Sequence, residues 1–127
     1  YSVMTDYREL YETAVRASEK SYSPYSSFRV GSALLSSDGK IFTGCNIENS
    51  SYSLTVCAER TAIFKAVSEG ITDFEVIAIY GTENPCIPCG ACLQVMSEFC
   101  NADFKIVLSD GIHTLSEFLP NVFSLKR

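Results

Sequence analysis

The sequence predicts an α/β domain in which a mixed β-sheet lies between layers of helices. Helical periodicity and strand-like apolar runs alternate along the chain, in the order helix, hairpin, helix, strand, helix, strand. The last two strand segments are apolar without alternation, as expected for strands that helices cover on both faces. This order predicts parallel crossover connections in the second half of the sheet.

The first half of the chain contains a helix and a hairpin. Asp6 followed by Glu9 resembles a capping pair, and apolar residues recur at helical spacing from Tyr7, which predicts an amphipathic helix to about Lys20. After the turn sequence SYSPYSS, the segments FRVGSALL and KIFTGCNI flank Ser-Asp-Gly at 37–39. A tight turn between two such runs predicts a β-hairpin.

The second half contains two further helices and two strands. Small and apolar residues recur at helical spacing between Thr55 and Glu69, and Gly70 supplies a helix stop. VIAIYG and FKIVLSD are predicted to be strands, and a third helix is expected between them, from Gly90 to Cys100. The length of 127 residues without repeats predicts a single domain, 1–127.

Composition indicates a compact domain and disfavours several classes of protein. The chain is 46% hydrophobic and 20% charged, which is ordinary for a globular domain. The formal net charge of −5 disfavours a nucleic-acid polymer as partner, because such binders present a basic surface. The sequence has neither a membrane-length apolar run nor the order of a signal peptide at its start, so we expect no membrane association and a cytoplasmic location. The six cysteines would then remain mostly reduced.

Three cysteines, Cys86, Cys89 and Cys92, lie three residues apart in PCIPCGACLQV. This spacing places thiols on one side of a helical turn, which suits a shared metal ion better than mutual disulfides. Cys57 opens the second predicted helix, and Cys89 and Cys92 open the third, where free N–H groups and the helix dipole favour the thiolate that a metal needs. Three thiolates leave tetrahedral zinc one position for water, as in catalytic sites.

Two alternatives remain open for these cysteines. Cys86 could complete a closed structural zinc site, because C-x-x-C spacing is equally suitable there. A ferredoxin-like iron–sulfur motif would continue with three residues and Cys-Pro, but the next cysteine here is Cys100, without a proline, so that match is weak. Cys45 and Cys100 lie in apolar or helical surroundings and are predicted to be structural.

Two segments, CAER at 57–60 and PCGAC at 88–92, resemble the zinc-dependent cytidine deaminase family in its small, homotetrameric three-cysteine form. YSPYSSFRVGSAL at 22–34 is similar to an opening strand motif of that family, and GCNIENSSY at 44–52 is similar to its nucleoside-binding segment. The resemblance covers nearly the whole chain. It implies a three-layer α-β-α sandwich around a mixed, roughly five-stranded sheet.

A related deaminase signature, H-x-E with P-C-x-x-C, has a histidine two positions before the glutamate. His113, the chain's one histidine, is followed by Thr114 and Leu115 and cannot carry this signature. Cys57 therefore takes the place of that histidine, and His113 is expected at the surface or behind the metal ligands.

The resemblance implies hydrolysis of cytidine and 2'-deoxycytidine to uridine and 2'-deoxyuridine, with release of ammonia, in pyrimidine salvage. Cys57, Cys89 and Cys92 would bind one Zn2+ per chain, and zinc lowers the pKa of bound water toward ~7. Glu59 would carry the proton of the water to the base and assist departure of the amine. Arg60 would offset the negative charge of three thiolates by hydrogen bonding to sulfur.

The family's nucleoside-binding positions imply a second set of site residues. Asn46 and Glu48 are two apart, so they would face one side and grip sugar hydroxyls if the strand continues through them. The carboxylate of Glu48 would also favour a nucleoside over a nucleotide. Phe28 would stack on the base, and Phe123 would reach into a neighbouring subunit's site in a homotetramer with shared active sites. The further substrate-binding positions that the resemblance implies are Asn49, Ser50 and Tyr52, whereas Gln94, like Arg60, matches a position behind the metal ligands.

Two residues depart from the family pattern. Leu93 stands where the family usually has arginine, which bears on the reaction rate, and Ser50 stands where alanine is usual, which bears on hydrogen bonding near the ribose. Two other functions remain open. One is deamination of another cytosine-like nucleoside, such as an antibiotic or a modified base, and the other is a non-catalytic structural zinc-binding module.

Overall fold

The computed structural model describes residues 7–82 and 85–125, which form one five-stranded sheet with helices on both faces. The strands are β1 (Val30–Ser36), β2 (Ile41–Cys45), β3 (Phe74–Gly81), β4 (Lys105–Leu108) and β5 (Gly111–Thr114). The helices are α2 (Arg8–Ser18), α3 (Ala58–Ser68), α4 (Gly90–Phe99) and α5 (Leu115–Phe118), with a short 3-10 turn at Tyr52–Leu54. Within these ranges no helix is long and apolar enough to cross a membrane.

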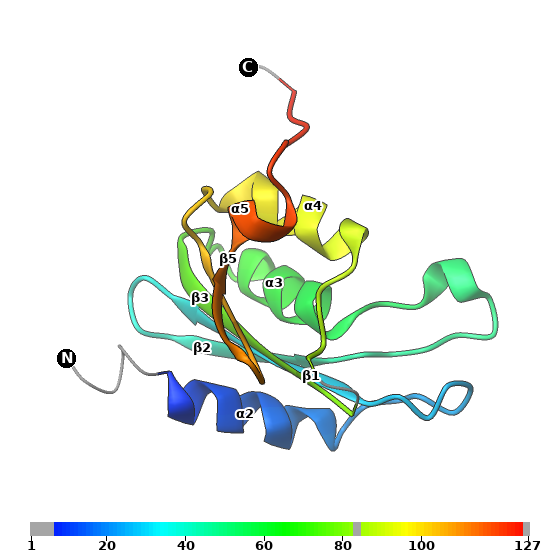
Figure 1. Cartoon of the computed structure of the whole chain (residues 1–127). Helices are drawn as coiled ribbons and strands as arrows, with labels where there is room; N and C mark the ends of the chain where they lie inside the picture. The colour runs from blue at the N-terminus through cyan, green and yellow to red at the C-terminus, as the bar shows by residue number, and fades with distance from the viewer. Residues whose placement is uncertain (1–6, 83–84, 126–127) are drawn as a thin grey trace.

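The helices form one layer on each face of the sheet (Figure 1). α2 covers one face, and α3, α4 and α5 cover the other. Each face has its own group of buried apolar side chains. Leu10 and Val76 belong to the group under α2, whereas Ile63, Ile77 and Met96 belong to the group under α3 and α4. The expected three-layer α-β-α sandwich is confirmed.

The sheet is mixed, with the strand order β2-β1-β3-β4-β5. β1 and β2 form the predicted antiparallel hairpin, in which Gly39 adopts the positive φ of 94° that the turn requires. β1 is also antiparallel to β3, so β2 and β3 run parallel and α3 connects them. β3 and β4 are parallel and connected by α4, so the expected crossovers are present.

The ends of the elements differ from the sequence-based expectations at several points. α2 ends at Ser18 rather than Lys20, and Asp6 of the expected cap lies outside the described residues. The helix expected from Thr55 begins at Ala58, because the chain before it is extended. β5 and α5 are four residues each, too short for the sequence periodicity to identify them individually.

α3 lies very close to β2 at Gly44. A Cβ atom placed on Gly44 would lie 2.4 Å from the carbonyl oxygen of Ala58 and 2.7 Å from the amide nitrogen of Ala62. A side chain at position 44 would therefore push α3 away from the sheet. Glycine on the strand and alanines on the helix fix the position of the first turn of α3, and this turn carries part of the candidate site.

Candidate active site

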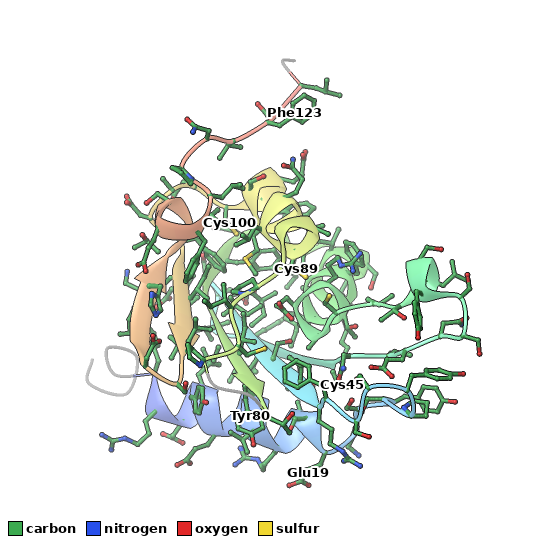
Figure 2. All side chains as sticks on the ribbon, turned by 45° about the vertical axis from the view of Figure 1, so that its right-hand side comes forward. Glu19, Cys45, Tyr80, Cys89, Cys100 and Phe123 are labelled. Carbon is green, nitrogen blue, oxygen red and sulfur yellow. The ribbon has the colours of Figure 1, made fainter. Side chains whose placement is uncertain are left out.

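The N-termini of α3 and α4 bring three cysteines together. Cys57 is the N-cap residue of α3, Cys89 is the N-cap residue of α4, and Cys92 lies in the first turn of α4. Their three Sγ atoms all lie within 4.8 Å of one another, with 3.7 Å between Cys57 and Cys89 and 3.4 Å between Cys89 and Cys92. Figure 2 shows Cys89 where α4 begins, on the side that faces α3. Neither N-cap side chain makes a capping hydrogen bond to its own helix, so these sulfur atoms are available as metal ligands.

The spacing of the thiols fits tetrahedral zinc. A Zn–S bond of about 2.3 Å places the sulfurs of such a site roughly 3.8 Å apart, close to the separations found here. Among residues 7–82 and 85–125, no fourth histidine, cysteine or carboxylate atom joins the group. Cys86 lies against β3 instead, since a Cβ placed on Gly81 would be 2.7 Å from its Sγ. This position argues against a closed four-cysteine site.

Glu59 and Arg60 follow Cys57 in the first turn of α3. The side chain of Glu59 is only 4% exposed, and this burial raises its pKa to about 7. A carboxyl group with a pKa near neutral pH can both accept and return a proton. Arg60 donates from Nη2 to Cys57 Sγ at 3.5 Å, while its buried Nε has no hydrogen-bond partner among the described residues. The guanidinium thus lies where it stabilises negative charge on sulfur.

The protein groups alone already favour a thiolate in the cluster. A hydrogen bond from Cys92, assisted by Arg60, lowers the pKa of Cys57 to about 5. The pKa of Cys92 is raised because it keeps its proton in that same hydrogen bond and is buried. Cys57 is therefore prepared to bind a cation, and a metal ion would displace the proton that Cys92 holds.

Asn46 is buried and joins the end of β2 to the segment 21–30. Its Oδ1 accepts hydrogen bonds from the amide of Val30, at 3.0 Å, and from the hydroxyl of Ser21, and its Nδ2 donates to the carbonyl of Phe28 at 2.8 Å. An amide Nδ2 carries two hydrogens, so Asn46 can make one further donation. β2 ends at Cys45, so the regular strand does not continue through Asn46 and Glu48 as the sequence analysis required.

Ile47 connects the surrounding segments through two isolated β-bridges. It pairs in parallel with Tyr22 and antiparallel with Val56. Val56 directly precedes the metal-ligand candidate Cys57. The segment after β2 and the start of α3 are thus joined by backbone hydrogen bonds.

Glu48 is held by the turn at 23–26. Its carboxylate accepts hydrogen bonds from the amides of Tyr25 and Ser26, at 3.0 and 3.2 Å, and from the hydroxyl of Ser26. The Ser26 hydroxyl is the main reason that the pKa of Glu48 is lowered. A cavity of about 280 Å³ lies beside this carboxylate, lined by Tyr25, Ser26, Glu48, Tyr52 and Thr55.

Comparison with known proteins identifies the family. Residues 4–108 match the family model described as the cytidine and deoxycytidylate deaminase zinc-binding region. The chain belongs to this deaminase family. The protein is therefore an enzyme of a zinc-binding family, and zinc is the ion that the three-cysteine cluster fits.

Individual relatives of this deaminase family agree over almost the whole chain. The cytidine deaminase of Sporosarcina psychrophila is 49% identical over 125 residues, which cover 94% of this chain and 92% of that protein. The cytidine deaminase of Halalkalibacterium halodurans is 51% identical, with coverage of 94% and 95%. The crystal structure of cytidine deaminase from Mycobacterium tuberculosis superposes with a TM-score of 0.88 at 36% identity and covers 94% of this chain and 98% of that one. The structure from Burkholderia pseudomallei gives a TM-score of 0.84 at 45% identity, with coverage of 91% and 97%.

The remaining family positions lie outside the three-cysteine cluster. Phe28 is half-buried at the edge of the core, beside Gly81. Tyr52 is 78% exposed and Phe123 is 68% exposed. Figure 2 shows Phe123 on the C-terminal segment beyond α5, and its carbonyl accepts a hydrogen bond from Gln94 at 3.1 Å.

Two further family positions make local hydrogen bonds. The side chain of Asn49 accepts from the amide of Ser51 at 2.9 Å, and the hydroxyl of Ser50 bonds to the hydroxyl of Tyr25 at 2.5 Å. The contacts of Tyr25 and Ser26 with Glu48 and Ser50 were not predicted from the sequence. The polar turn sequence SYSPYSS was the one signal that could have suggested them.

His113 lies on β5, outside the cysteine cluster, as the sequence analysis expected. Its two ring nitrogens lie 2.7 Å from carboxylate oxygens of Asp110 and Glu117. These hydrogen bonds raise the pKa of His113, and the one with Asp110 has the larger effect. His113 therefore joins the β4–β5 turn to α5 and has no place in the metal site.

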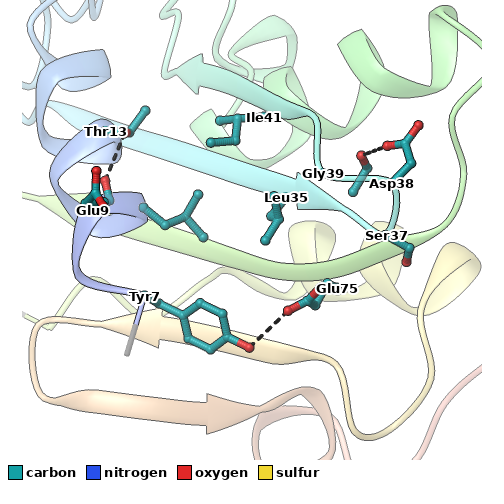
Figure 3. Close-up of a pocket in the computed structure, with 11 residues that line it drawn as sticks. Tyr7, Glu9, Thr13, Leu35, Ser37, Asp38, Gly39, Ile41 and Glu75 are labelled. Carbon is teal, nitrogen blue, oxygen red and sulfur yellow. Dashed lines mark hydrogen bonds between the residues drawn. The ribbon is translucent and has the colours of Figure 1, made fainter. Parts of the chain in front are cut away.

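A larger cavity, of about 520 Å³, lies between α2 and the β1–β2 hairpin (Figure 3). Tyr7 donates a hydrogen bond to Glu75 at 3.2 Å beside it, and Leu35 and Ile41 contribute apolar surface. None of the predicted site residues lines this cavity. Although this cavity is larger than the one beside Glu48, the thiols and the carboxyl group of Glu59 lie at the starts of α3 and α4.

Proposed function

We propose that the protein catalyses the zinc-dependent hydrolytic deamination of cytidine and 2'-deoxycytidine to uridine and 2'-deoxyuridine. One observation carries this proposal: the buried carboxyl group of Glu59 lies in the first turn of α3, two residues after Cys57 of the three-cysteine cluster. Three protein ligands leave a tetrahedral zinc ion one position for a non-protein ligand. The names of the relatives from Sporosarcina psychrophila and Halalkalibacterium halodurans support cytidine as the substrate.

The reaction replaces the amino group at C4 of cytosine with oxygen and releases ammonia. A zinc ion held by the three cysteines would lower the pKa of a water molecule toward about 7. Glu59 would accept one proton from that water and deliver it to N3 of the base, and would then transfer the second proton, from the new C4 hydroxyl group, to the departing amine. Arg60 stabilises the thiolate of Cys57 by hydrogen bonding to its sulfur. Cys57, Cys89 and Cys92 hold the ion, so the protein's own groups supply both the ligands and the proton carrier.

The nucleoside would bind between the cluster and the loop that carries Glu48. The carboxylate of Glu48, fixed by the turn at 23–26, accepts a ribose hydroxyl, and the free N–H of Asn46 donates to another. Phe28 stacks on the base. The anionic Glu48 disfavours a 5'-phosphate, so the substrate is a nucleoside. The other contacts that we assign to the substrate are Asn49, Ser50, Tyr52 and Phe123.

We also propose that residues 1–127 act as one catalytic domain in a homotetramer with shared active sites, in the cytoplasm and in pyrimidine salvage. The exposure of Tyr52 and Phe123 supports the shared site, because most of each residue is open to solvent within one chain. Burying them against a neighbour would remove apolar surface from water and close the site over the base.

A direct assay tests this function. Zinc-loaded protein is mixed with cytidine, the loss of cytidine ultraviolet absorbance is followed, and uridine and ammonia are quantified. We expect uridine and ammonia in equal amounts, and loss of turnover on chelation that added zinc restores. One zinc ion per chain without loss of cytidine would support the non-catalytic module. Turnover of a different cytosine-like nucleoside in preference to cytidine would support the alternative deaminase, in which the Ser50–Tyr25 hydrogen bond alters the ribose side.

A further inference from the structure

A third cavity, of about 310 Å³, lies at the edge of the sheet and is lined by basic side chains. Arg16 comes from α2, Lys20 lies two residues after the end of α2, and Lys65 comes from α3. The other lining residues are Thr13, Ala17, Thr43, Gly44, Cys45 and Thr61, so no carboxylate lines the cavity. Three cations in one cavity are unexpected on a chain with a formal net charge of −5.

The backbone of β2 adds hydrogen-bond donors to this cavity. β2 is the outer strand of the sheet, next to β1. Lys65 Nζ donates to the carbonyl of Thr43 at 2.5 Å, and Thr61 Oγ1 donates to the carbonyl of Cys45 at 3.1 Å, so both carbonyls point away from β1. In an antiparallel strand the N–H and C=O groups of one residue point to the same side. The N–H groups of Thr43 and Cys45 are therefore directed to the open edge as well.

The positive charge of this cavity is not neutralised by ion pairs. Within residues 7–82 and 85–125, both ion pairs that the structure contains belong to His113. Arg16 donates from Nη2 to the hydroxyl of Thr13 at 3.1 Å, which leaves other guanidinium N–H groups for a ligand. Lys20 is exposed at the end of α2. A ligand that enters the cavity would therefore meet three cations that form no ion pair with a carboxylate of the described residues.

We propose that this edge-strand cavity is a binding site for a small oxyanion, with a phosphate group as the chemistry that fits it best. A phosphate offers several acceptor oxygens and a double negative charge, which match three cations and two backbone N–H groups. Outward N–H groups of an edge strand otherwise face water or another chain, and an anion satisfies them. The site is distinct from the nucleoside site and does not depend on the proposed deaminase activity.

The cavity lies directly behind the metal-binding turn. Thr61 Oγ1 lies 3.1 Å from the carbonyl of Cys57 as well as from that of Cys45. An anion bound beside Thr61 would thus contact the same turn of α3 that positions Cys57. Binding at this edge is therefore placed to be sensed at the zinc cluster, although the anion and the nucleoside occupy different surfaces.

The experiment is a calorimetric titration of the zinc-loaded chain, residues 1–127, with inorganic phosphate at constant ionic strength set with chloride. A parallel titration uses a sugar phosphate. We expect one site per chain, and affinity reduced at least about fivefold in Lys20→Gln and further in the Arg16→Gln/Lys20→Gln double variant, because each removes one charge–charge contact. Lys105→Gln removes an exposed lysine on β4 and should bind phosphate like the wild type.

Each result separates the proposal from its alternatives. Tighter binding of the sugar phosphate would identify a phosphate ester as the ligand, and binding of inorganic phosphate alone would identify the free ion. Equal affinity in wild type, Lys20→Gln and the double variant would overturn the site, as would the absence of binding at millimolar phosphate. Displacement of phosphate by saturating cytidine would place the anion in the nucleoside site and also overturn it. Circular dichroism and zinc content of each variant verify that the fold is retained.

Discussion

The metal-binding half and the proposed nucleoside-binding half of the active site are built from different kinds of structure. The thiols and Glu59 lie on the first turns of two packed helices, and Glu59 is 4% exposed. The nucleoside half consists of loops around Glu48, with Tyr52 at 78% and Phe123 at 68% exposure. Rigid elements hold reacting groups in place, whereas loops adapt to a ligand and to a neighbouring chain. This contrast indicates that a single chain positions the metal ligands and Glu59. Covering the substrate, as we propose, requires residues of a neighbouring chain.

The largest effect is expected from removal of a thiol ligand. Cys89→Ala should lose zinc and with it all measurable turnover, because two thiolates cannot hold a tetrahedral ion firmly. Cys86→Ala is the matched control and should retain one zinc ion per chain, since Cys86 lies against Gly81 and outside the cluster. Elemental analysis after dialysis measures both. Equal zinc loss in the two variants would mean that Cys86 is a ligand after all.

Glu59→Gln should separate metal binding from chemistry. The amide keeps the shape of the side chain but cannot shuttle protons, so turnover should fall roughly a hundredfold to ten-thousandfold while zinc content stays constant. Glu69→Gln, at the opposite end of α3, is the control and should keep normal turnover. Wild-type rates in Glu59→Gln would remove this residue from the mechanism.

Phe123→Ala tests the open, nucleoside-binding half. If Phe123 covers the base in a neighbouring site, its loss should raise the KM for cytidine roughly tenfold, the cost of exposing part of an aromatic contact. Zinc content and folding should not change, because the side chain is 68% exposed within one chain. Leu125→Ala, in the same segment and 78% exposed, is the control. An unchanged KM together with unchanged elution in size-exclusion chromatography would contradict the shared site.

The smallest effect concerns His113, which belongs to neither half. Its pKa is raised in the folded protein by Asp110 and Glu117, so the stabilisation is complete below the unfolded value of 6.5 and is lost as the pH rises through the folded pKa. The contribution should be below about 1 kcal/mol, because solvent screens both exposed carboxylates. Thermal unfolding at several pH values should show His113→Gln losing more stability at pH 6 than at pH 8. Equal losses at both would exclude the charged pair.

The same contrast explains what could be predicted from the sequence. Cys57 and Cys89 open helices, and helix starts follow from local spacing, so the ligands and Glu59 were accessible before the fold was known. Spacing alone could not show that two helix starts meet. That they share one ion was a hypothesis from the chemistry of thiols at helix N-termini, which the resemblance to the deaminase family then supported. The partners of Glu48 were missed because hydrogen bonds across 22 and 23 positions depend on the folded chain. β5 was missed as a separate element because four residues carry too little periodicity.

The two β-bridges of Ile47 give the contrast between the halves a thermodynamic consequence. Ile47 pairs with Tyr22 on one side and with Val56, the neighbour of Cys57, on the other. A nucleoside that orders the segment around Ile47 would therefore also order the start of α3. In the same way, zinc that orders the start of α3 would also order the segment around Ile47. Because linkage is reciprocal, the factor by which zinc tightens nucleoside binding must equal the factor by which the nucleoside tightens zinc binding. When zinc is scarce, the enzyme molecules that are occupied by substrate would then be the last to lose their metal.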